Sequence, residues 1–320
     1  MNSQRVAVVG LGLLGRGIVA CFLGHGFEVV AFARNERSHD SVRKQIAEMM
    51  EELAELGGFG DHLCESWAAR FIPTADYQAL RDCSFVVESV AEDAAIKHEV
   101  FDQVEAQVAE TTVIASNSSA IPITLLQQRR KHPRRFLAMH WAEPAHATRF
   151  MEIIRGEQTS DLAIQTALAL AGRLGKEPSV LQKEIPGFIV NRIGYAMYRE
   201  ALNLLETGVA DAETIDRSVR NALGLWATVC GPFRWMDITG GPELYAKAMQ
   251  HVLPTLNNSS SVPLVMQKLA ESGAKGITNG RGFFNYTPED AKRWEELYRR
   301  HAWRVAQMQN DHFPEVKNPS

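Results

Sequence analysis

The sequence of 320 residues lacks the features that mark several specialised classes of protein. It contains no run of about 18 apolar residues, which a transmembrane helix would need. It has no surplus of basic residues either, since 34 Lys and Arg stand against 38 Asp and Glu and give a formal net charge of -4. A nucleic-acid-binding domain normally carries a basic excess. We therefore expect neither a membrane nor a nucleic-acid partner.

Cysteine is scarce, and the four cysteines are scattered without a CxxC pair or a neighbouring histidine at ligand spacing: Cys21, Cys64, Cys83 and Cys230. This pattern argues against a disulfide framework and against a zinc site, so we expect reduced thiols and no metal. The N-terminus enters the apolar run Val6–Val9 without a basic segment and a small-residue cleavage site. We read no signal peptide and expect a cytoplasmic location.

In the first half of the chain, short apolar runs alternate with helical patterns. The runs that predict strands are Val6–Val9, Glu28–Phe32, Phe85–Val90, Val113–Ser116, Phe136–His140 and Met151–Ile154. Helical segments lie between the first four of them, at Arg16–Leu23, Asp40–Leu56 and Ala95–Val108. This alternation predicts an α/β Rossmann fold with a doubly wound, parallel sheet. The last two strands, joined by short loops around Pro144, allow an antiparallel pairing.

After Gly187 the pattern becomes almost entirely helical. The predicted helices are Ile189–Thr207, Ala212–Leu223, Pro242–His251, Val262–Glu271 and Pro288–Gln309. We therefore predict two domains, a dinucleotide-binding Rossmann domain over residues 1–185 and an all-α C-terminal domain over residues 186–320. Helices such as Ile189–Leu205 are too apolar to remain exposed, so we expect the helical domain to form a homodimer that helps to complete each active site.

A glycine-rich motif, Gly10-Leu11-Gly12-Leu13-Leu14-Gly15, follows the first predicted strand and opens the first predicted helix. In a dinucleotide-binding loop the first glycine permits a tight turn, and the second lets the backbone approach a pyrophosphate. The third allows close packing of helix on strand, while the helix N-terminus offers free N–H groups to the anion. The motif predicts a nicotinamide dinucleotide site.

The end of the second strand indicates which dinucleotide is preferred. An NAD enzyme normally places a carboxylate there to accept hydrogen bonds from the ribose 2′-hydroxyl. This chain has Ala33, followed by Arg34 and Asn35. A guanidinium without a neighbouring carboxylate can pair with a 2′-phosphate, which favours NADP over NAD. NAD stays possible if Glu36 supplies the missing acid.

Polar residues follow the later strands, where ligands collect in a sheet of this type. They are Ser116-Asn117-Ser118-Ser119, Met139-His140-Trp141, Glu152, and Pro186-Gly187-Phe188-Ile189-Val190-Asn191-Arg192 at the entry to the helical domain. Together with the glycine motif, they make the chain resemble the 3-hydroxyacyl-CoA dehydrogenase family over nearly its whole length. The spacings from Asn117 to His140 and from His140 to Glu152 fit the family pattern without gaps.

The resemblance implies a role for each of these residues. His140 would be the general base that removes the hydroxyl proton while hydride leaves for the nicotinamide, and Glu152 would orient the imidazole. Ser119 and Asn191 would hold the substrate oxygen by hydrogen bonds. The resemblance further implies cofactor contacts from Glu92, Lys97 and Asn117.

Three departures from the family pattern bear on the substrate. Glu143 stands before Pro144 where the family has Asn. The acidic segment Glu51–Gly57 stands where acyl-CoA members present lysines to CoA phosphates, and an acidic surface would repel a diphosphate. That half of the site is nearer to the lambda-crystallin/L-gulonate 3-dehydrogenase branch, whose arginine is replaced here by Trp226. Trp141 and Trp226 predict a substrate pocket for an aromatic, apolar or cationic group.

These observations predict an oxidoreductase that interconverts a 3-hydroxy and a 3-keto group, on a small substrate without CoA. An L-3-hydroxyacyl-CoA dehydrogenase is one alternative. An imine or ketone reductase is another, although such enzymes carry a catalytic Lys on the inter-domain helix and Asn191–Leu205 has none. The third alternative is a non-catalytic, crystallin-like nucleotide-binding protein, against which the joint presence of the catalytic residues argues.

Overall fold

The computed structural model describes residues 4–313. These residues form two compact units, of which the first runs to Phe188 and also includes Ala302–Gln307, while the second comprises Ile189–His301 and residues 308–313. The domain boundary predicted between residues 185 and 186 is close to this division, and residues 314–320 of the predicted second domain lie outside the described residues. The extent of the two domains stays a prediction.

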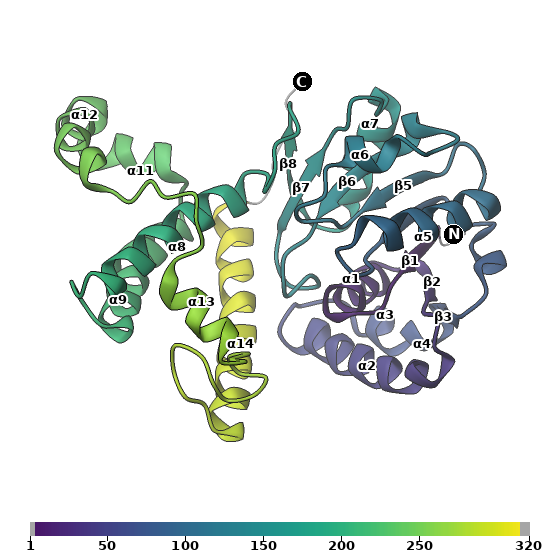
Figure 1. Ribbon diagram of the computed structural model, residues 1–320. Coiled ribbons are helices and arrows are strands. Elements are labelled where there is room, and N and C mark those ends of the chain that lie inside the picture. Colours follow the sequence, from purple (N-terminus) through teal and green to yellow (C-terminus); the bar gives the residue numbers. More distant parts are fainter. Residues whose placement is uncertain (1–3, 314–320) are drawn as a thin grey trace. The chain divides into compact units, whose positions relative to one another are not determined.

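The first unit is built on one eight-stranded sheet (Figure 1). Its strands are β1 (Arg5–Val9), β2 (Glu28–Phe32), β3 (Phe71–Thr74), β4 (Phe85–Glu88), β5 (Val113–Ser116), β6 (Phe136–His140), β7 (Phe150–Ile154) and β8 (Glu177–Leu181). They lie in the order β3-β2-β1-β4-β5-β6-β7-β8, and neighbours are parallel except for β6 and β7, which pair antiparallel. The doubly wound sheet and the antiparallel pair are thereby confirmed.

Both faces of the sheet are covered by helices of the first unit. The helices are α1 (Leu13–Gly24), α2 (His39–Glu55), α3 (Asp61–Glu65), α4 (Trp67–Arg70), α5 (Ala94–Gln107), α6 (Ile123–Gln127) and α7 (Asp161–Arg173). Short 3-10 turns occur at η1 (Glu36–Ser38), η2 (Tyr77–Leu80) and η3 (Pro133–Arg135). Side-chain caps fix where two of the helices begin: Asp93 accepts from the Ile96 N–H ahead of α5, and Ser160 accepts from the Ala163 N–H ahead of α7.

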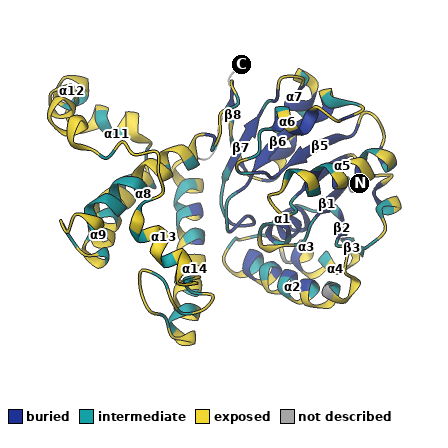
Figure 2. Ribbon diagram, viewed as in Figure 1, coloured by how far each residue is buried: buried dark blue, intermediate teal, exposed yellow. Residues whose placement is uncertain are grey.

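Two apolar clusters form the core, one on each face of the sheet. Val6 and Val8 of β1 pack into a cluster with α1, α2 and α7, whereas Ala7 and Val9 pack into a second cluster with α5 and α6. Alternate residues of a strand point to opposite faces, so a strand buried on both sides must be apolar throughout. Figure 2 shows most of this sheet in the colour of buried residues.

The second unit is helical, in agreement with the predicted all-α domain. Its helical segments are α8 (Val190–Glu206), α9 (Ala212–Ser218), the π-helical η4 (Val219–Leu223), α10 (Gly224–Ala227), α11 (Pro232–Ile238), α12 (Gly241–Val252), η5 (Leu253–Thr255), α13 (Leu264–Glu271) and most of α14 (Pro288–His312). Thr287 begins α14 with a reciprocal capping box to Asp290. Among the described residues, no helix has the length and apolar character needed to cross a membrane.

Candidate active site

The three glycines of the motif occupy the loop between β1 and α1. Gly10 has φ of +100°, and a Cβ there would lie 2.5 Å from the Ser89 carbonyl oxygen. A Cβ on Gly15 would lie 2.0 Å from the Gly10 carbonyl oxygen, so the tight turn and the close helix packing predicted for these two glycines are confirmed. A Cβ on Gly12 would meet nothing within 4 Å among the described residues. The open space beside Gly12 fits an approaching pyrophosphate.

A cavity of about 420 Å³ lies at the carboxyl ends of β1, β2 and β4, next to this loop. Ala33, Arg34 and Asn35 line it together with Gly10 and Gly12. Gly15 is buried behind the loop and Leu13 is exposed at the first turn of α1, and neither these two nor Leu14 is among the lining residues. No Asp or Glu is found among the described residues that line the cavity, and Glu36 is the exposed first residue of η1.

Sequence reasoning missed several residues of this cavity. Arg16, Ser41 and Tyr77 also line it, and the Tyr77 ring stacks on Phe32 with centroids 4.0 Å apart. Arg16 lies on α1 and Ser41 lies on α2, and both helices begin near the ends of strands. A helical wheel of each helix could have identified these two residues as facing the cavity. Tyr77 comes from η2, a short turn between two strands, and no local motif marks it.

The catalytic residues predicted from the sequence, His140 and Glu152, lie directly opposite each other in the antiparallel pair β6–β7. His140 Nδ1 and Glu152 Oε2 are 2.9 Å apart, and the residues are 5% and 1% exposed. A buried carboxylate is stabilised by such a charge-assisted hydrogen bond. With Nδ1 donating to Glu152, Nε2 is left as the proton acceptor.

Ser119 reaches this histidine from the loop after β5. Its Oγ lies 3.2 Å from His140 Nε2, so the hydroxyl and the imidazole converge on one point. The imidazole ring packs edge-on against Phe150, with centroids 5.7 Å apart, and against Phe188 at 5.3 Å. Phe188 is buried and has φ of +54°, which is rare for a residue other than glycine. The sequence contained Phe188 in a recognised motif, but nothing local identified it as a contact of His140.

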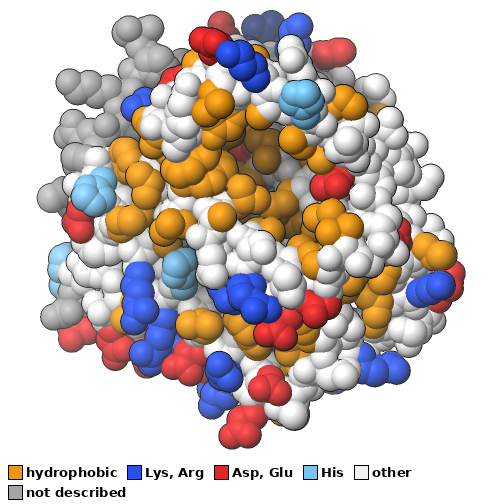
Figure 3. All heavy atoms as spheres, turned by 90° about the vertical axis from the view of Figure 1, so that its left-hand side faces the viewer, with side chains coloured by type: hydrophobic (Ala, Val, Ile, Leu, Met, Phe, Trp, Pro, Cys, Tyr) orange, Lys and Arg blue, Asp and Glu red, His pale blue; other side chains and the backbone are white. Residues whose placement is uncertain are grey.

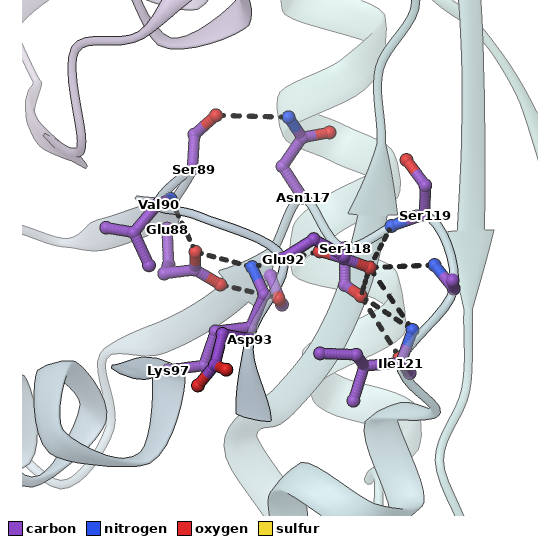
Figure 4. A network of polar contacts seen from close by, with 12 residues as sticks. Glu88, Ser89, Val90, Glu92, Asp93, Lys97, Asn117, Ser118, Ser119 and Ile121 are labelled. Carbon is purple, nitrogen blue, oxygen red and sulfur yellow. Dashed lines mark hydrogen bonds and ion pairs between the residues drawn. The ribbon is translucent and has the colours of Figure 1, made fainter. Parts of the chain in front are cut away.

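A buried polar network joins the ends of β4 and β5 beneath this site (Figure 4). Lys97 Nζ lies 2.7 Å from Glu88 Oε1 and 3.4 Å from Glu92 Oε2. The Lys97 side chain is 1% exposed, which places it beneath the surface where a ribose contact had been expected. Asn117 donates from Nδ2 to Ser89 Oγ and accepts from the Trp141 N–H, and so links the ends of three neighbouring strands.

Trp141 occupies a different environment from the one expected. The residue is 1% exposed, its ring packs against Phe22 with centroids 6.3 Å apart, and the Lys176 amine lies 5.1 Å from the ring centroid. The indole therefore fills the core on the α1 face of the sheet, and the prediction that it faces a substrate pocket is corrected. Beyond it, burial raises the pKa of the Glu143 carboxyl above its ordinary value, against the opposing charges of His146 and Arg16.

The acidic segment of α2 is also less uniform than the sequence indicated. Glu51 and Glu55 are exposed, but Glu52 is buried. Its Oε2 lies 3.3 Å from His146 Nε2 and accepts a hydrogen bond from Trp303 Nε1 at 3.2 Å. Glu52 therefore belongs to the packing of the first unit, and only the neighbouring glutamates contribute to an acidic surface.

Two predicted substrate contacts belong to the second unit. Asn191 is the second residue of α8, and Trp226 lies in α10, where its ring stacks on Trp235 with centroids 5.4 Å apart and planes 12° apart. Their roles in holding a substrate stay predictions.

Comparison with family models gives two matches that together span most of the chain. Residues 5–185 match the 3-hydroxyacyl-CoA dehydrogenase, NAD binding domain, and residues 187–286 match the 3-hydroxyacyl-CoA dehydrogenase, C-terminal domain.

Individual relatives include enzymes with and without CoA in their names. The chain is 33% identical over 290 residues to 5-formyl-3-hydroxy-2-methylpyridine 4-carboxylate 5-dehydrogenase of Mesorhizobium japonicum, covering 90% of this chain and 93% of the relative. It is 32% identical over 284 residues to a probable 3-hydroxybutyryl-CoA dehydrogenase of Deinococcus radiodurans, covering 88% and 100%. A crystal structure of the pyridine carboxylate dehydrogenase, described as an NAD+ dependent dismutase, has a TM-score of 0.89 at 30% identity and covers 96% of this chain and 98% of that one.

The glycine loop gives a prediction that separates folding from nucleotide binding. Gly15→Ala forces a Cβ against the Gly10 carbonyl and should lower the free energy of unfolding by about 1–3 kcal/mol or more. Gly12→Ala meets no described atom and should change it by less than about 0.5 kcal/mol. The added methyl should nevertheless weaken dinucleotide binding by about tenfold or more, because it fills the space beside the pyrophosphate. Denaturant unfolding and fluorescence titration with NADH or NADPH measure the two effects, and equal stability losses would contradict this assignment.

Proposed function

The chain belongs to the 3-hydroxyacyl-CoA dehydrogenase family, and within that family we propose that it interconverts a hydroxyl and a keto group on a small substrate without coenzyme A. As a member of this family it is a dehydrogenase that acts on CH–OH groups. The observation that carries the proposal is the arrangement Glu152–His140–Ser119, in which a buried carboxylate, an imidazole and a hydroxyl follow one another at hydrogen-bond distance.

In the proposed mechanism, His140 Nε2 and Ser119 Oγ together bind the oxygen of the substrate. In the oxidative direction Nε2 accepts the hydroxyl proton, and Glu152 stabilises the imidazolium that results. In the reductive direction the imidazolium returns the proton to the developing alkoxide. Ser119 donates a hydrogen bond to that oxygen as negative charge collects on it. Phe150 and Phe188 keep the ring in its plane.

The first unit offers a place for the nicotinamide dinucleotide. The open backbone at Gly12 and the uncapped N-terminus of α1 would hold the pyrophosphate, and the cavity beside Ala33 and Arg34 would hold the adenosine half. A dinucleotide held there would supply its nicotinamide ring as the acceptor of the hydride from the carbinol carbon.

The absence of CoA from the proposed substrate has two supports. Glu51 and Glu55 present negative charge at the exposed face of α2, which would repel the phosphates of CoA. The Mesorhizobium relative is named for a pyridine carboxylate, and the chain matches 93% of its length. The Deinococcus relative, named as a 3-hydroxybutyryl-CoA dehydrogenase, makes L-3-hydroxyacyl-CoA oxidation the second candidate.

The proposed reaction can be tested by following oxidation of NADH and NADPH with a panel of 3-keto acids, 3-keto esters, cyclic ketones, pyridine aldehydes and acyl-CoA thioesters. We expect turnover of a small non-CoA compound. His140→Gln should lower kcat by about 10²–10⁴, because a general base is removed, without a matching loss of cofactor affinity. Glu152→Gln should lower kcat as well and displace the acid limb of the pH–rate profile. Retention of most of the activity in His140→Gln, or turnover of CoA thioesters alone, would contradict the proposal.

Among the nicotinamide cofactors, we propose that NADP(H) is preferred. Arg34 and Ser41 line the cavity next to Ala33, and the lining residues that the structure describes include no carboxylate to accept bonds from a ribose 2′-hydroxyl. The family's domain is an NAD-binding one and the structural relative is described as NAD+ dependent, so the distinction rests on Arg34.

A charge-assisted pair between Arg34 and a 2′-phosphate is worth roughly 1.5–3 kcal/mol, or about 10–150-fold in relative kcat/KM. The wild-type enzyme should therefore show a kcat/KM for NADPH above that for NADH on one substrate. The double variant Ala33→Asp/Arg34→Gln should reverse the order, because the new carboxylate accepts from the ribose hydroxyl and repels the phosphate. A clear preference of the wild type for NADH would refute the proposal.

We further propose that the second unit forms a homodimer in a cytoplasmic enzyme. In the described chain, α8 contains no buried residue, and Ile193, Tyr195 and Tyr198 are exposed by 59%, 69% and 52%. Hydrophobic side chains gather over the helices of this unit in Figure 3. An apolar surface of this kind is normally covered by a partner. The free thiols at Cys21, Cys64, Cys83 and Cys230 suit a reducing compartment.

Light scattering at micromolar concentration should give twice the mass of one chain. Ile193→Asp should shift the mass towards that of a monomer, because a charge would be buried in the interface. Leu162→Asp is a matched control, since Leu162 is an exposed apolar residue of α7 in the first unit and should leave the mass unchanged. A monomeric wild-type mass would rule the dimer out.

A further inference from the structure

The segment that carries Ser119 has no regular secondary structure, and its shape comes from one carboxylate. Glu92 Oε1 accepts a hydrogen bond from Ser118 Oγ at 2.5 Å and from three successive N–H groups, those of Ser119, Ala120 and Ile121, at 3.0, 2.8 and 3.2 Å (Figure 4). Three consecutive amides on one oxygen fix the backbone of residues 119–121 around that point.

The negative charge of Glu92 is stabilised by the ammonium group of Lys97. Its Oε2 lies 3.4 Å from Lys97 Nζ, which is in turn held 2.7 Å from Glu88 Oε1. Glu88 is fully buried and also accepts from Ser116 Oγ at 2.6 Å and from the Val90 N–H at 2.7 Å. The ammonium therefore sits between two carboxylates, one of them locked into the end of β4. Lys97 cannot leave without stranding a buried negative charge.

This environment favours the anionic form of Glu92. Partial burial by itself raises the pKa of the carboxyl, but the hydrogen bonds from Ser118, Ala120 and Ile121 and the charge of Lys97 together bring that pKa below its ordinary value. The carboxylate is thus the form that holds residues 118–121 in place over the working pH range.

We propose that Glu92 is a positioning residue that presents the Ser119 hydroxyl to His140 Nε2. Ser119 contributes one of the three N–H groups on Glu92 Oε1, and its own Oγ lies 3.2 Å from the imidazole. The same oxygen already accepts four donors and has no capacity left for a ribose hydroxyl. Only Oε2, which lies 3.4 Å from Lys97 Nζ, could still meet a cofactor, and the side chain as a whole is 39% accessible. The proposal rests on the proposed function, because it needs His140 and Ser119 to act on the substrate.

The proposal predicts a separation of kcat from cofactor binding. A displacement of about 1 Å in a group that orients the reacting atoms can cost on the order of a hundredfold in rate. Glu92→Gln keeps the size of the side chain but removes the charge that Lys97 and the three amides stabilise. We expect kcat to fall by about ten- to a hundredfold on the panel substrate that the wild type turns over best. We expect the dissociation constants of NADH and NADPH, measured by fluorescence titration, to change by less than about threefold.

A double-mutant cycle with Ser119→Ala shows whether Glu92 acts through Ser119. If it does, Glu92→Gln/Ser119→Ala should be no slower than Ser119→Ala alone, because residues that act as one unit are not additive. Glu99→Gln removes the same charge from an exposed position on α5 and is the matched control, which should leave kcat unchanged. The proposal would be overturned if the losses in kcat of the two single variants multiplied in the double variant. It would also be overturned, in favour of a ribose contact, if Glu92→Gln raised the cofactor dissociation constant and left kcat unchanged.

A second variant guards against misfolding of Glu92→Gln. Ser118→Ala removes the hydroxyl that donates to Glu92 and accepts from the Ile121 N–H, while the carboxylate stays in place. It should lower kcat several-fold and should again be non-additive with Ser119→Ala; additivity in this cycle would also overturn the proposal. If the proposed function is wrong, the wild type will be inactive on the panel, or His140→Gln will be fully active. If only the positioning role is wrong, the wild type will be active and Glu92→Gln will have the same kcat as the wild type.

Discussion

The antiparallel pairing of β6 with β7 is the constraint on which the candidate active site depends. Because β7 runs opposite to β6, the last residue of β6 lies beside the third residue of β7, and His140 meets Glu152. A parallel neighbour would need a crossover of a dozen or more residues, whereas residues 141–149 are enough for the reversal. A register slip of one residue would turn the carboxylate to the other face of the sheet. The pairing of the two strands and the pairing of His140 with Glu152 are therefore one feature.

The other strand ends are joined to this pair by polar groups that the sheet buries. Asn117, at the end of β5, bonds to Ser89 after β4 and to the Trp141 amide after β6. Lys97 lies between the carboxylates of Glu88 and Glu92, and the negative charge that it leaves uncompensated is stabilised by the four hydrogen bonds that Glu92 accepts from residues 118–121. The cofactor cavity begins at Ser89 and Val90 on the same segment. The proposed cofactor cavity and His140 are thus attached to one edge of the sheet, an arrangement that suits the proposed hydride transfer, which would tolerate little displacement.

The strands that could be predicted from the sequence are those with mainly apolar residues on both faces of the sheet. Six of the strands are mostly apolar, and their alternation with helical patterns is enough to predict the doubly wound sheet. The two strands that were missed, β3 and β8, are the two edges of that sheet. β3 contains Pro73, and β8 contains Pro178. In both strands most residues are at least partly exposed, so neither forms a continuous apolar run. Proline is compatible with an edge strand because an edge has unpaired positions, but it makes the sequence resemble a loop.

The site shows where such reasoning stops. The strand-end rule brought His140, Glu152 and Ser119 together correctly in space, but the direction of a side chain needs a further argument. For Trp141 that argument was present in the sequence. Leu137 and Met139 pack on the α1 face, so strict alternation sends residue 141 to that face and His140 to the opposite one. For Glu52, the sequence contained no argument that would predict its burial. That carboxylate is buried by Trp303, 251 positions further along the chain, and no local pattern in an acidic helix distinguishes a glutamate that solvent covers from one that a distant indole covers. Side-chain direction within a strand follows from its period, whereas burial by a remote partner is a property of the folded chain alone.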